Sequence, residues 1–224
     1  MICVSVVGRE ISEIERKAEK ALRLGGDLVE LRLDFLKNLR LEELRRLVSR
    51  FAERAIVTLR PSWEGGGYKG SEEERIRIIE EAASEKPAYV DLELMTRDLE
   101  KVSRRLRRHT RLIVSFHDFS ETPSEEALAA RARRCLSYGD LGKIVTMSSS
   151  LSDNLKILGL YGRKDLPNGR LMAFAMGEKG VISRILSPIL GSPIAYACLP
   201  GEEVAPGQLT LHELRGLLRL VEKR

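Results

Sequence analysis

Cysteine is scarce and widely spaced in this chain. Its 224 residues include three cysteines, Cys3, Cys135 and Cys198, and none belongs to a CxxC pair. An odd, scattered set supports neither a disulfide framework nor a zinc knuckle. We therefore expect reduced thiols and a cytoplasmic protein.

Aromatic residues are also few, which weighs against binding to nucleic acid. They make up 5% of the chain, and none interrupts the densest basic run, Lys101 to Arg111. Single-strand binders combine basic grooves with aromatic platforms on which bases stack. The formal net charge is +5, and we interpret the basic run as a solvated helix face. No nucleic-acid partner is expected.

Long apolar runs are missing as well. No stretch approaches the roughly 18 residues of a membrane span. The first residues, MICVSVVGRE, enter a strand-like run without a basic leader. We expect a protein that neither leaves the cell nor crosses a membrane.

Several cofactor and nucleophile motifs have no counterpart in the sequence. The residues after the first predicted strand, Gly8-Arg9-Glu10, do not form a GxGxxG loop, and there is no Walker loop or GxSxG elbow. The three histidines lie far apart, and Asp91 with Glu93 supplies only two ligands. We expect neither a metal nor a nucleotide cofactor.

What the sequence does contain is a regular alternation of strand-like and helix-like segments. The predicted strands are ICVSVV, LVELRL, AIVTLR, AYVDLEL, RLIVSF, KIVTM, LMAFAM and PIAYAC, starting at residues 2, 28, 55, 88, 111, 143, 171 and 193. Amphipathic segments such as 11–24, 41–51, 71–83 and 123–136 lie between them. Eight units of roughly 28 residues, with no linker, predict a single (β/α)8 TIM-type barrel over residues 1–224. A doubly wound sheet would have fewer strands and a glycine-rich phosphate loop.

The predicted helix ends carry recognisable caps. Ser71 and Ser124 precede helices that have acidic first turns, as N-caps do. Gly25 and Gly139 follow helices and are predicted to be left-handed C-terminal caps.

In such a barrel, reactive groups lie at the C-terminal ends of the strands and in the loops that follow them. The residues at those positions are Ser5, Glu30, Arg32, Asp34, Arg60, Glu64, Asp91, Glu93, His117, Asp118, Met176, Gly180 and Arg184. The loop after the last strand, residues 200–210, is rich in proline and glycine and carries Gln208. We expect this loop to fold over the mouth of the barrel.

Strand alternation places Glu30, Arg32 and Asp34 on one face of the second strand. Charges inside a barrel cost several kcal/mol unless they are paired or bound to a ligand. On this segment alone, a structural ion pair between Glu30 and Arg32 and a ligand-binding role are equal alternatives.

Two further residues have chemistry that suits catalysis. His117 ends an apolar run, and histidine is well matched to proton transfer near neutral pH; a packing role beside Asp118 is the alternative. His109 and His212 are expected on the surface. Lys143 opens the sixth predicted strand and either extends out of the bottom of the barrel or points inward. If it points inward, burial and nearby arginines would lower its pKa and leave a neutral amine able to form a Schiff base.

Six segments, taken in order, resemble the type I 3-dehydroquinate dehydratases of the shikimate pathway. They are ELRLD, TLRPSWEGG, SFHDF, the lysine of KIVTM, AMGEKGVISRI and APGQLT, within a match that runs from Ser5 to Gln208. The resemblance implies a (β/α)8 barrel, usually a homodimer, that needs no cofactor. Such a barrel converts 3-dehydroquinate to 3-dehydroshikimate and water.

The resemblance also assigns roles to the candidate residues. It implies that Lys143 forms a Schiff base with the substrate ketone, that His117 is the general acid-base, and that Glu64 orients His117. The implied substrate-binding residues are Arg184 for the carboxylate, Gln208 from the loop, Glu30, Arg32 and Arg60 for the ring hydroxyls, and Ser5 and Met176 as lining. Many family members have a serine where this chain has Val204, so one hydroxyl contact would be missing.

Two other functions compete with the dehydratase. A class I aldolase would use Lys143 in the same way, with residues 177–180 cradling a phosphate before a helix. A nucleic-acid-binding module would use the basic run at Lys101 to Arg111. Paired arginines and carboxylates suit a polyhydroxy acid, and the resemblance favours the dehydratase.

Overall fold

Eight parallel strands form the centre of the molecule in a computed structural model that describes residues 1–222. The strands are β1 (Ile2–Val7), β2 (Leu28–Arg32), β3 (Ala55–Thr58), β4 (Tyr89–Glu93), β5 (Arg111–Asp118), β6 (Leu141–Met147), β7 (Leu171–Met176) and β8 (Ala195–Ala197). Each strand from β1 to β6 pairs with the next one along the chain, and β8 pairs with β1. The sheet therefore curls into a barrel whose ladder, within residues 1–222, is open only between β7 and β8.

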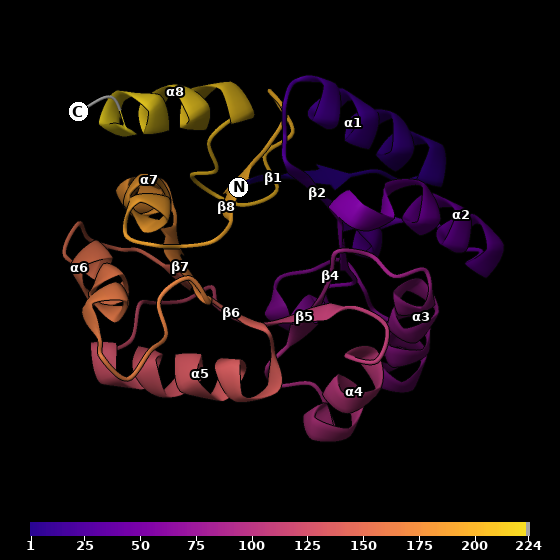
Figure 1. Cartoon of the computed structure of the whole chain (residues 1–224), viewed down its shortest axis with the longest axis horizontal. Helices are drawn as coiled ribbons and strands as arrows, with labels where there is room; N and C mark the ends of the chain where they lie inside the picture. The colour runs from indigo at the N-terminus through magenta and orange to yellow at the C-terminus, as the bar shows by residue number, and fades with distance from the viewer. Residues whose placement is uncertain (223–224) are drawn as a thin grey trace.

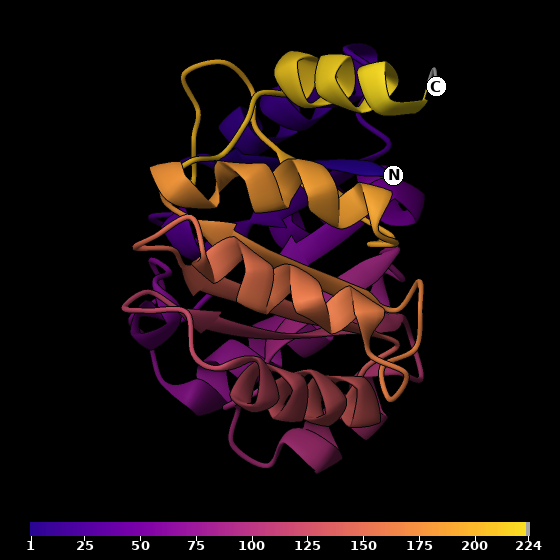
Figure 2. The ribbon, with the colours of Figure 1, turned by 90° about the vertical axis from the view of Figure 1, so that its left-hand side faces the viewer.

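Helices surround this sheet on the outside (Figure 1). They are α1 (Ile11–Arg23), α2 (Leu41–Phe51), α3 (Glu72–Ser84), α4 (Leu99–Leu106), α5 (Glu125–Tyr138), α6 (Asp153–Leu158), α7 (Val181–Ile189) and α8 (Leu211–Glu222). Short 3-10 turns lie at 33–35, 52–54, 62–64, 159–162 and 178–180. In the side view, the strands run behind the helices that cover them (Figure 2). The predicted (β/α)8 barrel is confirmed.

Alternation along the strands separates two apolar layers. In β1, Val4 and Val6 pack outward with helix residues such as Ile14 of α1, as strand geometry requires. Burying such a side chain fully is worth about 1.5–3 kcal/mol. Inside the barrel, a second apolar cluster includes Cys3, Leu28, Ile56, Tyr89, Ile113 and Leu141, which lie toward the N-terminal ends of their strands. These side chains close the lower interior, so the polar inward-facing residues lie above them.

The predicted caps are partly right. The hydroxyl of Ser71 accepts a hydrogen bond from the Glu74 amide (3.1 Å), and that of Ser124 accepts one from Ala127 (3.4 Å). Gly25 has a positive φ of 96°, as a left-handed cap requires. The prediction for Gly139 is wrong, because its backbone is extended at φ −108° and ψ 162°.

Glycine is nevertheless needed at position 139. A Cβ atom there would lie 2.7 Å from the carbonyl oxygen of Leu141. Close approach of the chain to itself between α5 and β6, rather than helix capping, therefore explains this residue.

Strand β6 begins two residues earlier than predicted, at Leu141. Lys143 is therefore the third residue of the strand, and it is only 4% exposed to solvent. The alternative in which this side chain extends out of the bottom of the barrel is wrong.

None of the helices within residues 1–222 combines the length and the apolar character that a bilayer crossing requires. The three cysteines are free and buried.

Candidate active site

One pocket lies at the C-terminal ends of the strands and has a volume of about 540 Å³, its open mouth included. All ten candidate side chains line it: Ser5, Glu30, Arg32, Arg60, Glu64, His117, Lys143, Met176, Arg184 and Gln208. The volume is in the range of small-molecule sites. The remaining lining residues are Gly65, Phe119, Val145, Phe174, Tyr196, Val204 and Ala205.

Lys143 projects inward from β6 and is held by charged neighbours. Its Nζ donates a hydrogen bond to Oδ2 of Asp91 (3.0 Å) and lies 3.7 Å from Oε1 of Glu30. The ring centroid of Tyr196 is 4.1 Å from the same nitrogen. We expected arginines to be the main charges beside this amine, but it is instead ion-paired with two carboxylates.

Both carboxylates are ionised despite their burial. Burial disfavours the charge on Glu30, but Lys143 and Arg32 outweigh it and lower the pKa of this carboxyl. The hydroxyls of Ser5 and Thr58 also donate to its oxygens, at 2.6 and 2.9 Å. The floor of the pocket is therefore a fixed anionic surface around the Lys143 amine.

The charge of Asp91 is stabilised in the same way. Burial opposes its ionisation, but Arg60 and Lys143 outweigh it and hold its pKa well below the ordinary value. The Ser115 hydroxyl donates to Oδ1 of Asp91 at 2.6 Å. We had noted Asp91 at a strand end but assigned it no role, although its inward position in β4 was readable from the alternation.

His117 and Glu64 form a second, separate pair. Nδ1 of His117 lies 3.0 Å from Oε2 of Glu64, and both side chains are largely buried. Burial raises the pKa of Glu64 to about 8. Burial also lowers the pKa of His117 well below its ordinary value, and the charges of Arg60 and Lys143 lower it further. The imidazole is therefore neutral near pH 7, and its hydrogen-bond partner is Glu64 rather than Asp118.

Arg184 of α7 is a buried cation that has no carboxylate partner among the described residues. Its guanidinium lies 4.9 Å from the Phe174 ring centroid, and Nη2 donates to the carbonyl of Pro206 at 3.3 Å. Its Nε has no partner within the described part of the chain. Burial lowers its pKa to about 10. An uncompensated cation in a pocket is the feature that an anionic ligand would satisfy.

The other two arginines of the pocket are already paired with carboxylates. Arg32 binds Asp34 through two hydrogen bonds of 2.9 and 2.7 Å. The alternative ion pair between Glu30 and Arg32 is therefore not formed. Arg60 binds Oε1 of Glu93 (2.9 Å) and Oδ1 of Asp91 (3.1 Å).

The loop after β8 covers part of the mouth. Within it, the side chain of Gln208 accepts a hydrogen bond from the Val204 amide (2.9 Å) and donates to the carbonyl of Ala197 (3.1 Å). The Pro206 carbonyl accepts a bond from the Gly177 amide at 3.0 Å. These contacts hold the loop over the pocket, as the sequence predicts, with Val204 facing the cavity.

The tyrosine beside Lys143 was not identified from the sequence. Tyr196 faces inward from β8, and its hydroxyl has no hydrogen-bond partner among the described residues. Burial raises its pKa well above the ordinary value, so the phenol is neutral. Strand alternation in the predicted strand PIAYAC could have identified Tyr196 as an inward-facing residue.

The two histidines that we expected on the surface do lie there, whereas the strand-end residue Asp118 is outside the pocket. His109 and His212 are exposed. Asp118 does not line the pocket and instead accepts hydrogen bonds from the amides of Ser120 and Glu121. Within the basic run, Arg104 and Arg105 pair with Glu100 and Glu80 on the helical surface.

Metal-ligating side chains do not converge in the part of the chain that the structure describes. No group of three or more His, Cys, Asp or Glu residues is placed to hold a metal ion there.

A family model and curated sequence relatives of this chain agree on one family. A model of the type I 3-dehydroquinases matches residues 2–224. The 3-dehydroquinate dehydratase of Methanopyrus kandleri is 39% identical over 223 residues, covering 99% of this chain and 100% of that protein. That of Methanococcus maripaludis strain C5 is 36% identical over 226 residues, with coverages of 99% and 100%.

A solved structure agrees with these sequence relatives. The type I 3-dehydroquinate dehydratase of Clostridium difficile has a TM-score of 0.89 and 27% identity, over 99% of this chain and 92% of that one. The chain therefore belongs to the type I 3-dehydroquinase family of hydro-lyases.

Proposed function

We propose that this protein dehydrates 3-dehydroquinate to 3-dehydroshikimate through a Schiff base on Lys143. The observation that carries the proposal is the presence, in one pocket, of a buried amine, a buried His117–Glu64 pair and the uncompensated cation of Arg184. A keto acid matches all three, since it brings a carbonyl for the amine, an acidic C–H bond for the histidine and a carboxylate for the arginine.

The first stage joins the substrate to the enzyme. His117 first takes a proton from the Lys143 ammonium, and the neutral amine then attacks the ketone carbon to form a carbinolamine. The carbinolamine hydroxyl takes a proton from His117 and leaves as water, which produces a protonated imine. A proton beside this iminium is far more acidic than one beside a ketone, because the resulting enamine is neutral.

The second stage eliminates water. The nitrogen Nδ1 of His117 faces Glu64, so Nε2 is the atom left for the substrate. Nε2 removes the proton from the carbon next to the iminium, and the imidazolium then protonates the β-hydroxyl as it leaves. Hydrolysis of the conjugated imine consumes one water, releases 3-dehydroshikimate and regenerates the lysine.

The rest of the pocket binds the substrate in this proposal. Arg184 binds the carboxylate with its planar guanidinium. The residues assigned to the ring hydroxyls and to the lining are Glu30, Arg32, Arg60, Gln208, Ser5 and Met176. Three of these carry charges that protein groups already fix in place, so they can orient hydroxyls without reorganising.

The aldolase alternative gains no support from the phosphate region that it requires. The Gly177 amide already donates to Pro206, and the Gly180 amide donates to the Gly177 carbonyl, each at 3.0 Å. These groups are therefore not available as a phosphate cradle.

Borohydride trapping tests the proposal. The wild-type protein is incubated with 3-dehydroquinate and sodium borohydride, and the reduced adduct is located by peptide mass spectrometry. We expect a single adduct, on Lys143. Lys156→Met is the control, since Lys156 pairs with Asp153 outside the pocket, and should be trapped like wild type. Turnover without an adduct, or an adduct on another lysine, would refute the mechanism.

We also propose a cytoplasmic homodimer. The free, buried cysteines suit a reducing compartment. The neighbouring helices α6 and α7 leave Leu155 and Ile182 exposed at 74% and 48%, which offers an apolar surface for a second copy. Cell fractionation and light scattering after gel filtration test these two statements; a monomer at micromolar concentration contradicts the second.

A further inference from the structure

The strongest unassigned feature is an arginine that lies outside the pocket yet connects to it. Arg75 belongs to α3, on the outer side of the sheet, and is fully buried at 0% exposure. Arginine is almost never fully buried unless its charge is paired. A cation in this position therefore needs an explanation in terms of what it contacts.

The guanidinium of Arg75 uses its donors on four groups. Nε and Nη2 bind the two oxygens of Glu72 at 2.7 and 2.8 Å, and Nη2 also donates to the Thr96 hydroxyl at 3.0 Å. Nη1 donates to Oε2 of Glu93 and to the carbonyl of Leu59, the latter at 3.4 Å. A planar, five-donor group is suited to this arrangement, and a lysine is not.

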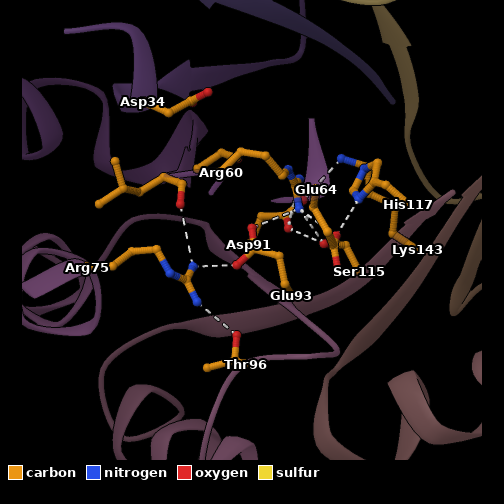
Figure 3. Close-up of polar contacts among 12 residues, drawn as sticks. Asp34, Arg60, Glu64, Arg75, Asp91, Glu93, Thr96, Ser115, His117 and Lys143 are labelled. Atoms are coloured by element: carbon orange, nitrogen blue, oxygen red, sulfur yellow. Dashed lines mark hydrogen bonds and ion pairs between the residues drawn. The ribbon is translucent and has the colours of Figure 1, made fainter. Parts of the chain in front are cut away.

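Two of these contacts lead directly to Arg60. The Leu59 carbonyl belongs to the peptide bond that precedes Arg60. Glu93, at 0% exposure, bridges the two arginines, because its other oxygen, Oε1, binds Nη1 of Arg60 at 2.9 Å. Figure 3 shows this path, from Arg75 through Glu93 to Arg60.

From Arg60 the network divides toward both catalytic groups. Nη2 of Arg60 binds Asp91 at 3.1 Å, and Asp91 holds the Lys143 amine at 3.0 Å. Nη1 lies 3.8 Å from Oε2 of Glu64, the atom that contacts His117 (Figure 3). The position of Arg60 therefore affects both arms of the site.

We propose that Arg75 is a positioning residue for the dehydration reaction and acts through Glu93 to hold Arg60. This inference rests on the proposed roles of Lys143 and His117. In a dry interior, a carboxylate shared by two cations is held between them. When Arg75 is absent, Glu93 has one cation and its burial favours protonation. Arg60 then loses its anchor on one side.

The expected consequence is measurable in the pH profile of kcat/KM. Arg60 lowers the pKa values of both His117 and Glu64. If Arg60 moves away, both pKa values rise, and the acidic limb moves to higher pH. A role in fold stability alone would leave that limb in place.

The test uses Arg75→Met, Glu93→Gln and the double variant, each checked for fold by circular dichroism and thermal melting. We expect each single variant to lower kcat/KM by about 10- to 100-fold and to shift the acidic limb upward. The double variant should be no worse than the more impaired single one, because both changes interrupt one path. Wild-type kcat/KM with an unmoved limb in folded Arg75→Met, or losses that multiply in the double variant, would overturn the proposal.

Glu72→Gln is the matched control. Glu72 is an outer partner of Arg75, and its side chain is 24% exposed. The substitution removes the charge of this partner and leaves the contact of Arg75 with Glu93. We expect a lower Tm with an unchanged pH profile. A limb that shifts as far as that of Arg75→Met would mean general loosening of α3 and would overturn the proposal.

If Arg75→Met does not fold, the kinetics of the double variant test the proposal instead. It leaves no uncompensated carboxylate at position 93, so it removes the main reason for misfolding. Impairment equal to that of Glu93→Gln supports the proposal, and wild-type kinetics contradict it. Borohydride trapping of wild-type protein depends on none of these variants, so it separates a failure of the proposed mechanism from a failure of this inference.

Discussion

The Nδ1 atom of His117 lies 3.0 Å from Oε2 of Glu64, so the orientation of the imidazole is fixed by a carboxyl group from another strand end. This contact leaves Nε2 as the proton-exchanging atom. It also couples the two titrations, so the pair gains and loses protons as a unit.

Replacing His117 by alanine should separate imine formation from turnover. Lys143 keeps its contacts with Asp91 and Glu30 in this variant, so the amine is still presented to the ketone. We expect borohydride to trap the adduct, while kcat falls by about 10²- to 10⁴-fold, the usual contribution of a general acid-base. Steady-state kinetics and intact-protein mass measure the two quantities; unchanged turnover contradicts the assigned role.

The pair also predicts a pH dependence. Because burial raises the pKa of Glu64 to about 8, the pair keeps an extra proton below that pH, and Nε2 is then protonated rather than free to act as a base. We expect kcat/KM to rise with pH and to level off near 8. In Glu64→Gln the limb should disappear and kcat should fall by about 10²- to 10⁴-fold, because the amide favours the wrong imidazole tautomer. A limb that persists in this variant would assign it to another group.

Glu64 should also cost stability at alkaline pH. Its pKa is higher in the folded chain than in the unfolded chain, so its contribution to stability is fully present below about pH 4.5 and is lost as the pH rises through about 8. Glutamine has no such loss. We expect Glu64→Gln to raise Tm relative to wild type by several degrees more at pH 9 than at pH 5, since one pKa unit corresponds to about 1.4 kcal/mol. Equal differences at the two pH values would contradict the raised pKa.

Arg184 should act on binding more than on chemistry. Its buried guanidinium has no carboxylate partner in the described chain, and the proposed substrate supplies one. We expect Arg184→Met to raise KM by about 100-fold, since losing a charge-assisted bidentate pair costs roughly 3 kcal/mol, and to abolish competition by simple carboxylic acids. Arg184→Lys should recover only part of the affinity, because it cannot bind both oxygens. Unchanged KM in the methionine variant would remove Arg184 from the carboxylate site.

Much of the pocket was predictable because strand alternation is a local property. The shared face of Glu30 and Arg32 follows from period-two patterning, whereas the direction of Lys143 stayed open until the start of β6 was known. The barrel brings strand ends together whatever their spacing in sequence. The pocket is lined by all ten residues to which the family resemblance assigns a role, but not by the strand-end residues Asp34 and Asp118. Their catalytic and binding roles stay predictions until the variants are measured.

Tertiary partners were not predictable in the same way. Arg32 turns to Asp34 rather than Glu30 because the chain leaves β2 at Arg32 and enters a 3-10 turn. Arg75 has a helical position that reads as surface, and only the packing of α3 on the sheet shows that it is buried. Gly139 was predicted to be a cap because it follows a helix. Its close contact with Leu141, which is the actual reason for glycine there, leaves no pattern in the local sequence.

The apolar cluster that fills the lower barrel makes the pocket a dead end. Cys3, Ile56 and Ile113 are all 0% exposed there, so no passage runs through the cylinder to its other face. The substrate and both products must therefore pass through the same opening, which the loop at residues 200–208 partly covers. Because entry and release use the same opening, the product must leave before the next substrate molecule can bind.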